Sequence, residues 1–197
     1  MAHMTSTGNS VRNHTGYPGL SVGSISPVAF RNACGMFGTG VTVITTRSDG
    51  ADHGMTANAF MSISLVPPLV AVSVANTAKM LAHIRQSGRF AVSILDEGRE
   101  ALALHFAGRP DRSIGEPFYD FDDLPGVKYA CTVLATDVEQ EVAAGDHVIF
   151  VGRVSRMHVE PDRAPLIFHK GKFGKLLSVE RNEADRALNL LWHGGHW

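Results

Sequence analysis

Residues 53–79 hold the side chains whose types and spacing are best suited to binding chemistry. Thr56–Asn58 would present a hydroxyl, backbone amides and a carboxamide at the end of a strand, an edge of donors and acceptors that can hold a flat polar ring. Asn76-Thr77 offers side-chain oxygens to cap a helix over 78–86, and Lys79 adds a positive charge in its first turn. Because a helix N-terminus has unpaired N–H groups, the segment suits a phosphate-bearing cofactor. The same spacing also fits a plain strand-to-helix connection, and that alternative stays open.

The elements that must position these residues are mostly strands. Alternating and β-branched runs predict antiparallel pairs of strands. A turn at Ser48-Asp49-Gly50 joins the two strands of one pair, and a turn at 143–146 joins those of another. Pro67 and Pro68 end the strand that follows Asn58. We expect strands at 41–46, 59–65, 69–75, 89–95, 128–142, 147–159, 166–169 and 173–177, and one more strand that begins at 52. Helices are expected from Pro27 to the glycines at 38 and 40, at 78–86 with Gly88 as its C-cap, and at 97–107 with Asp96 as its N-cap, followed by a loop to 126.

Composition bounds the class of protein. With 18 Lys and Arg against 19 Asp and Glu, the chain lacks the positive field that nucleic acid or an anionic membrane attracts. No apolar run is long enough to span a membrane, and the N-terminus lacks a signal-peptide core, so we expect a cytoplasmic protein. Cys34 and Cys131 are expected to be buried, reduced thiols. We expect a flexible N-terminal segment with a cloning remnant at 1–24, one domain at 25–180 and a tail at 181–197.

Several ordered motifs resemble those of the short-chain flavin reductases. They are FGTGVTVITT, HGMTANAFMSISLVPPLV, NTAK, RFAVSIL, LALHFA, GDHVIFVGRV and PLIFHKGKF, and together they cover about 30–177. The resemblance implies a mainly β (α+β) fold, an FMN-binding split β-barrel with peripheral helices, which the strand count also favours. It further implies a homodimer with flavin near the subunit interface, and an NAD(P)H:flavin oxidoreductase that supplies reduced flavin to a flavin-dependent monooxygenase.

The resemblance also assigns site residues. Those expected to bind the flavin ring, ribityl chain and phosphate are His53, Gly54, Met55, Thr56, Asn58, Ala59, Ser73, Val74, Ala75, Lys79, Met80, His105 and Phe106. Two of them depart from the family pattern. Ala59 stands where the family usually has Ser, and Met80 where it usually has a small hydroxyl residue, so backbone amides are expected to replace those two side-chain contacts.

The GDH motif, Gly145-Asp146-His147, resembles the nicotinamide-binding turn of the family. The resemblance implies that its glycine allows close backbone approach and that its imidazole hydrogen-bonds the carboxamide or phosphate. From the residues alone, a surface turn is the alternative for His147. Phe173 either covers the stacked rings or is a core aromatic. Hydride passes between the two cofactors, so no catalytic side chain is expected. Asp122-Asp123 is expected to be a solvated turn. His193 and His196 form an incomplete metal site, and we expect no metal.

Three hypotheses follow. The first is a reductase of diffusible FMN or FAD that consumes NADH or NADPH, and the second is a non-catalytic flavin-binding split-barrel protein. The third, weaker one is an oxidase or reductase of another small substrate on the same barrel. The sequence does not decide between FMN and FAD, or between NADH and NADPH. Arg153 and Arg156 are candidates for meeting a 2′-phosphate, although strand arginines that face outward are common.

Overall fold

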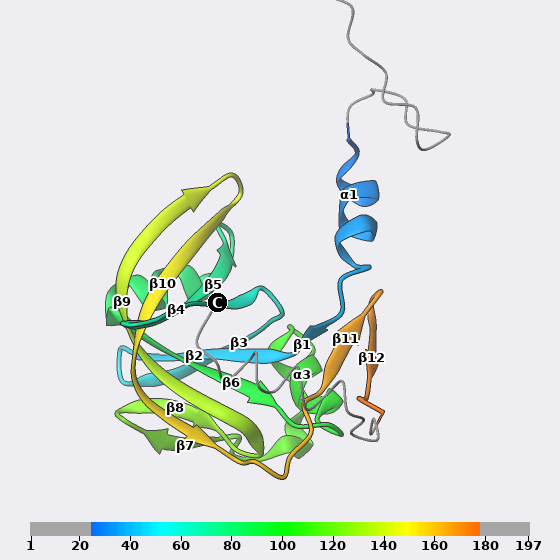
Figure 1. Ribbon diagram of the computed structural model, residues 1–197. Helices are drawn as coiled ribbons and strands as arrows, with labels where there is room; N and C mark the ends of the chain where they lie inside the picture. Colours follow the sequence, from blue (N-terminus) through cyan, green and yellow to red (C-terminus); the bar gives the residue numbers. More distant parts are fainter. Residues whose placement is uncertain (1–24, 178–197) are drawn as a thin grey trace, which may run out of the picture.

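The computed structural model describes residues 25–177 (Figure 1). Its helices are α1 (Pro27–Cys34), α2 (Lys79–Ser87), α3 (Glu100–Phe106) and the 3-10 helix η1 (Arg112–Ile114). Its strands are β1 (Thr39–Gly40), β2 (Thr42–Ser48), β3 (Ala51–Ala57), β4 (Phe60–Leu65), β5 (Pro68–Ala75), β6 (Arg89–Leu95), β7 (Phe118–Phe121), β8 (Leu124–Val127), β9 (Ala130–Ala144), β10 (His147–Val159), β11 (Ile167–His169) and β12 (Lys172–Gly174). None of the described helices has the length and apolar character needed to cross a membrane.

Seven antiparallel strands form the main sheet in the order β3-β2-β6-β9-β10-β5-β4. β3 and β4 are its opposite edges, yet only Asn58 and Ala59 separate them in the chain. Three Cα steps span at most about 11 Å, so the sheet must curl until its two edges lie close together. The Ser73 N–H donates to the Ala59 carbonyl at 3.1 Å, which extends the pairing of β4 with β5 to the residue before β4. We call the junction of β3 and β4 at Asn58-Ala59 the seam; it gives the split barrel that the resemblance implies.

Apolar side chains fill the barrel interior. Phe90, Phe150 and Ile44 are fully buried there, and α2 contributes Met80 and Ile84, so this helix closes one end. A Cβ at position 152 would lie 2.7 Å from the Phe90 ring, so the barrel needs glycine at that point of β10. The interior is therefore a packed core, and a ligand must bind elsewhere.

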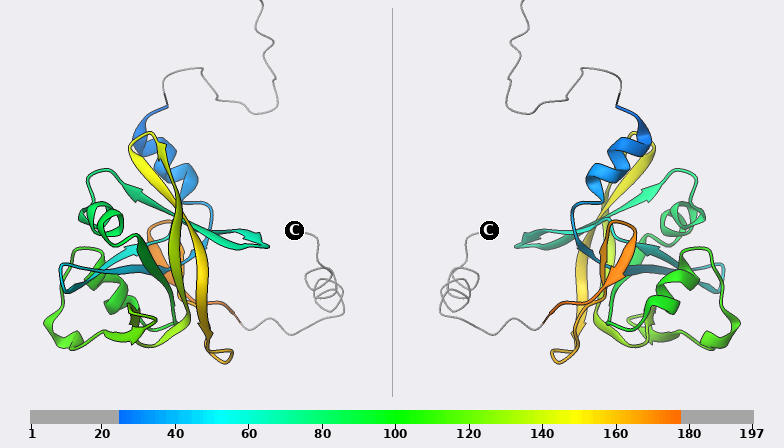
Figure 2. Two further views of the ribbon diagram at one scale, coloured as in Figure 1. Left: turned by 90° about the vertical axis from the view of Figure 1, so that its left-hand side faces the viewer. Right: turned by 90° about the vertical axis from the view of Figure 1, so that its right-hand side faces the viewer.

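Smaller layers cover the outside of the barrel. α3 and the sheet β1-β11-β12 enclose a second core around Leu95, Leu102 and Leu166. The β7-β8 hairpin packs below the sheet, where Thr45 Oγ1 donates to the Pro125 carbonyl and the Val127 N–H donates to Ser93 Oγ. Figure 1 shows α1 standing away from the barrel, and this helix has no buried residue. Figure 2 shows the β11-β12 hairpin and the long β9-β10 hairpin from two further sides.

Most predicted elements are confirmed, and four details were wrong. α1 ends at Cys34 with Gly35 as its C-cap, earlier than the glycines at 38 and 40 suggested. Asp96 does not cap a helix: it forms a β-bridge with Pro165, and α3 starts at Glu100. The predicted loop to 126 contains η1, β7 and β8. Cys131 is buried as expected, but Cys34 is exposed because α1 packs on nothing in the described chain.

Candidate functional site

The end of β3 presents its polar groups on the outer face of the barrel. Strand alternation turns Met55 and Ala57 toward the core, and it turns Gly54 and Thr56 toward α3. Thr56 Oγ1 donates to the Ala103 carbonyl at 2.6 Å, so its hydroxyl hydrogen is used within the protein. Asn58 and Ala59 are exposed at the seam, which leaves the carboxamide and the backbone there accessible to a ligand.

Two cavities meet at the seam. One, of ≈ 800 Å³, lies between the end of α1 and the β11-β12 turn, and the other, of ≈ 410 Å³, lies between α3 and β12. Asn58, Phe168 and Gly171 line both of them. Thr39 lines the larger cavity, and its Oγ1 atom is buried and has no hydrogen-bond partner among the described residues. A buried hydroxyl without a partner is costly unless something binds it, so it points to a polar ligand atom.

A third hollow continues along β3, where Gly54, His105 and Phe106 meet. A Cβ on Gly54 would lie 2.6 Å from the Phe106 ring, so glycine is required for α3 to approach this strand. The His105 ring stands edge-on to Phe106 with its Nδ1 accepting from the Asp111 N–H at 3.0 Å. These three residues therefore form one wall beside the seam.

His53 lies apart from that wall. Its ring stacks on His83 of α2, with centroids 3.6 Å apart and an angle of 12° between the rings. His83 Nδ1 also pairs with Ser48 Oγ at 2.9 Å. Burial lowers the pKa of His83, and the nearby His53 lowers it further. The pair thus connects α2 to the β2-β3 turn.

The corner between β5 and α2 is where the phosphate of the flavin is expected to bind. Ser73 and Ala75 lie on the outer face of β5, whereas Val74 and Met80 are buried in the core, so those two can meet an outer ligand only through their backbone. Lys79 is exposed as the first residue of α2. The predicted cap was wrong in detail: Ala78 is the N-cap and makes no side-chain hydrogen bond, because the Asn76 side chain reaches Gly145 instead. The free N–H groups of the first turn remain, as a phosphate site requires.

The GDH turn lies beside this corner. Gly145 has φ 64°, and His147 pairs with Ala75 across the sheet, which puts both side chains on the outer face. Asp146 Oδ1 lies 2.7 Å from His147 Nδ1. This hydrogen bond lowers the pKa of Asp146, whose carboxylate therefore stays charged and leaves Nε2 of His147 free to face a ligand.

Phe173 is an aromatic residue of the second core, and its role in covering the cofactor rings stays a prediction. It packs against Phe168 in the second core, with ring centroids 5.5 Å apart, and it lines the smaller cavity. Sequence reasoning missed the other residues of that region, Thr39, Phe168 and Lys170. β1 is far in the chain from β11 and from the turn that follows β11. Only the pairing of β1 with β11 brings these residues to the seam. The HKGKF segment was the one sequence signal that could have indicated Phe168 and Lys170.

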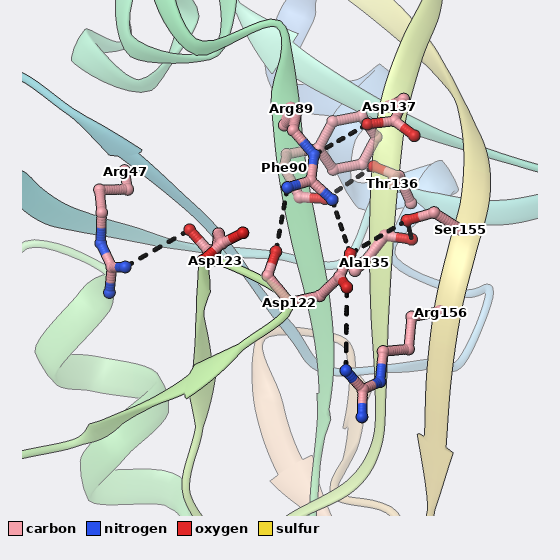
Figure 3. A network of polar contacts seen from close by, with 10 residues as sticks. All are labelled: Arg47, Arg89, Phe90, Asp122, Asp123, Ala135, Thr136, Asp137, Ser155 and Arg156. Atoms are coloured by element: carbon pink, nitrogen blue, oxygen red, sulfur yellow. Dashed lines mark hydrogen bonds and ion pairs between the residues drawn. The ribbon is translucent and has the colours of Figure 1, made fainter.

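Charged residues near β7-β8 form a structural network (Figure 3). Asp122 accepts from Arg89 at 2.7 Å and lies 3.8 Å from Arg156, while Arg89 also reaches Asp137 at 2.8 Å. The expectation of a solvated turn was wrong for Asp122, although Asp123 is exposed. Arg153 pairs with Glu139, so both arginines considered for a 2′-phosphate already face carboxylates. His193 and His196 lie outside the described residues.

The residues present fit a flavin. The seam offers an exposed carboxamide, an unpartnered buried hydroxyl and aromatic walls for a planar polar ring, and the first turn of α2 with Lys79 suits its phosphate. Cavities of this size are typical of sites for small organic ligands. Fold and site together define a split-barrel protein whose outer face is shaped for a flat, phosphate-bearing cofactor.

Comparison with known proteins gives the family. The model described as "Flavin reductase like domain" matches residues 34–177. An NADH-dependent flavin reductase of a Rhodococcus species is 40% identical over 162 residues, covering 81% of this chain and 92% of that protein. The reductase component of 4-hydroxyphenylacetate 3-monooxygenase from Thermus thermophilus is 40% identical over 149 residues, covering 76% and 96%. The chain therefore belongs to the flavin reductase-like domain family.

Solved structures agree with the family and the fold. The flavin reductase PheA2 in its native state has a TM-score of 0.75 and 45% identity, covering 78% of this chain and 99% of that one. The NADH:FAD oxidoreductase SgcE6 of Streptomyces globisporus, in complex with NAD and FAD fragments, has a TM-score of 0.71 and 34% identity, covering 77% and 93%. The latter is a family member captured with both kinds of ligand.

Proposed function

We propose that the protein is an NAD(P)H-dependent flavin reductase that delivers reduced FMN or FAD to a flavin-dependent monooxygenase component. One observation carries the proposal: the seam, the start of α2 and the GDH turn share one outer face. The Ser73 N–H bonds to Ala59, and the Asn76 N–H bonds to Asp146 at 2.9 Å. The proposed ring, phosphate and nicotinamide subsites are therefore neighbours, as a direct transfer between two stacked cofactors requires.

The hydride chemistry is supplied by the nicotinamide and the flavin when both are bound, and the protein positions them. The seam holds one ring edge through Asn58 and through backbone groups next to Ala59. Lys79 and the free N–H groups of α2 bind phosphate. Asp146 orients His147 so that Nε2 faces the second ligand. Phe168 and Phe173 exclude water from the cavity beside the seam.

The proposed partner, and the proposal that flavin diffuses as a substrate, rest on the names of related proteins. Several relatives are named as reductase components or subunits of monooxygenases, including that of Thermus thermophilus and the HsaB subunit of Rhodococcus jostii. We infer the same division of labour here, with flavin as a substrate as much as a cofactor. We propose a cytoplasmic location, where both cofactors are available.

We also propose a homodimer. Large apolar side chains are exposed on α1, in the segment that joins it to β1, and on the edge strand β4, and all three border the seam. Exposed apolar groups gathered at an unpaired strand edge are typical of an interface. They are Val28, Phe30, Met36, Phe37, Met61, Ile63 and Leu65. A second copy on this surface would close the flavin site, so an isolated subunit would be incomplete.

The direct test is consumption of NADH or NADPH by the purified protein with added FMN, FAD or riboflavin, in all pairings. We expect consumption that depends on the added flavin. Tight flavin binding without turnover in any pairing would favour a non-catalytic flavin-binding protein and would overturn the proposal.

His147→Ala tests the nicotinamide subsite. Loss of one hydrogen bond to the ligand should lower kcat/KM for NAD(P)H about tenfold, which corresponds to about 1.4 kcal/mol, while the flavin Kd changes little. His158→Ala is the matched control, because His158 lies on the same strand and likewise pairs with a carboxylate, Glu160, at 2.9 Å. Equal effects of the two substitutions would contradict the assignment.

A further inference from the structure

Asn76 joins two parts of the site that are far apart in the chain. Its backbone N–H donates to the Asp146 carbonyl at 2.9 Å, and its side-chain Nδ2 donates to the Gly145 carbonyl at 3.3 Å. One residue of the β5-α2 corner thus binds both carbonyls at the tip of the β9-β10 hairpin. No other side-chain hydrogen bond from the described residues reaches this tip apart from that within the Asp146–His147 pair.

These bonds are poorly placed to stabilise the fold. Asn76, Gly145 and Asp146 are all exposed, and an exposed hydrogen bond replaces one that water would make. The hairpin is already fixed by the pairing of β10 with β5 and β9. The side chain of Asn76 therefore has little effect on stability and acts on the orientation of the turn that carries His147.

A hydrogen-bonded turn connects the corner to α2. The Ala78 N–H donates to the Ala75 carbonyl at 2.9 Å, so 75–78 forms a turn that leads directly into α2. The unpaired N–H groups of α2 then begin at Lys79, three residues from Asn76. An anion bound there would order the same short turn from which the Asn76 side chain extends.

We infer that Asn76 is a positioning residue that couples the phosphate end of the flavin site to the nicotinamide turn. The inference rests on the proposed function, and it adds a specificity: a phosphorylated flavin promotes NAD(P)H binding, and riboflavin does so less. Because such coupling is reciprocal, NAD(P)H must also favour the phosphorylated flavin to the same degree.

The experiment compares wild type, Asn76→Ala and Thr77→Ala. Thr77 is the matched control, since it lies in the same exposed turn and does not cap α2. KM for NADH and kcat are measured with saturating FMN and with saturating riboflavin, together with the FMN Kd and the melting temperature. In the wild type and in Thr77→Ala we expect a KM for NADH about five- to tenfold lower with FMN than with riboflavin, at the low end of the usual range of coupling between sites.

In Asn76→Ala the two KM values should become equal, at the higher level, with kcat, FMN Kd and melting temperature close to wild type. A merely structural role would instead lower the melting temperature or change both variants alike. If flavin-dependent turnover occurs but Asn76→Ala keeps the FMN advantage, or if the wild type shows none, the coupling is refuted while the reductase function stands. Absence of turnover with every flavin refutes the proposed function itself.

Discussion

At the scale of single residues, Gly54 decides how closely α3 can approach β3. The Phe106 ring occupies the space that a Cβ at position 54 would need, and Thr56 bonds to α3 two residues further on. Helix and strand together form the wall beside the seam. A change in their separation therefore changes the site as well as the packing.

Gly54→Ala should destabilise the protein by about 1–3 kcal/mol, the usual cost of overpacking, and should weaken flavin binding because α3 is displaced. Urea unfolding and flavin titration measure the two effects. Gly38→Ala is the control, since a Cβ there meets nothing within 4 Å and the position lies outside the strands. Unchanged stability of Gly54→Ala would show that the Phe106 ring moves aside freely.

His83 provides a prediction for pH. Its pKa is lowered in the folded protein by burial and by His53, with Lys79 acting in the same direction and Asp49 opposing. As pH falls through the unfolded value of 6.5, the unfolded chain binds the proton first. The free energy of unfolding should therefore decrease as pH falls below 6.5. His83→Gln should reduce this dependence in denaturant titrations from pH 7.5 to 5.5. His169→Gln, at an exposed histidine, should leave it as in wild type.

At the scale of elements, the β7-β8 hairpin is attached to the barrel by its turn. Asp122 and Asp123 both have positive φ, and the Asp122 carboxylate reaches back to Arg89 of β6 (Figure 3). Arg47 of β2 contacts Asp120 of β7 at 3.0 Å. Since the side chains of Arg89 and Asp122 are about one-third exposed, this pair is better protected from solvent than the Arg85–Glu141 pair.

Asp122→Asn keeps a residue type that tolerates positive φ and removes the charge that faces Arg89. We expect a loss of about 1–2 kcal/mol in the free energy of unfolding, because a hydrogen bond to a charged group is weakened in a partly buried place. Glu141→Gln breaks a more exposed pair with Arg85 and should change stability much less. Equal losses in the two variants would contradict a special role for the hairpin turn.

The same elements show how far sequence could predict this structure. The runs from Thr42 to Leu95 were readable because alternation and β-branched residues are local signals. β8 was not, since its Pro125 and Gly126 ordinarily argue against a strand; buried bonds from Thr45 and Ser93 hold it in place. In the candidate site, motif order predicted segments that the fold brings to one face, and their role in binding stays a prediction.

Which side chains of those segments face a ligand could not be known from motif order. Val74 and Met80 belong to the core, and Asn76 leaves its expected capping position for a carbonyl 69 residues away. Contacts of this kind exist only once the sheet has curled.

At the scale of the whole molecule, two residues connect the edge strands of the barrel, and the proposed ligand site lies at that connection. β3 ends and β4 begins on either side of Asn58-Ala59, and both of these residues are exposed there. The apolar residues of β4 and α1 border the same place. Site and proposed interface are thus two consequences of one topological feature, and they should be lost together.

Met61→Asp tests this link. Met61 is 58% exposed on β4, and a charge there should disfavour a second copy, giving a monomer by analytical ultracentrifugation and at least a tenfold weaker flavin Kd, equivalent to about 1.4 kcal/mol. Met157→Asp is the matched control: Met157 is 65% exposed, but it lies on β10 opposite Leu134, away from the seam. Because both side chains are exposed, neither substitution should unfold the chain. A monomeric Met61→Asp variant that binds flavin normally would show that one subunit suffices, and a wild type that sediments as a monomer would refute the dimer outright.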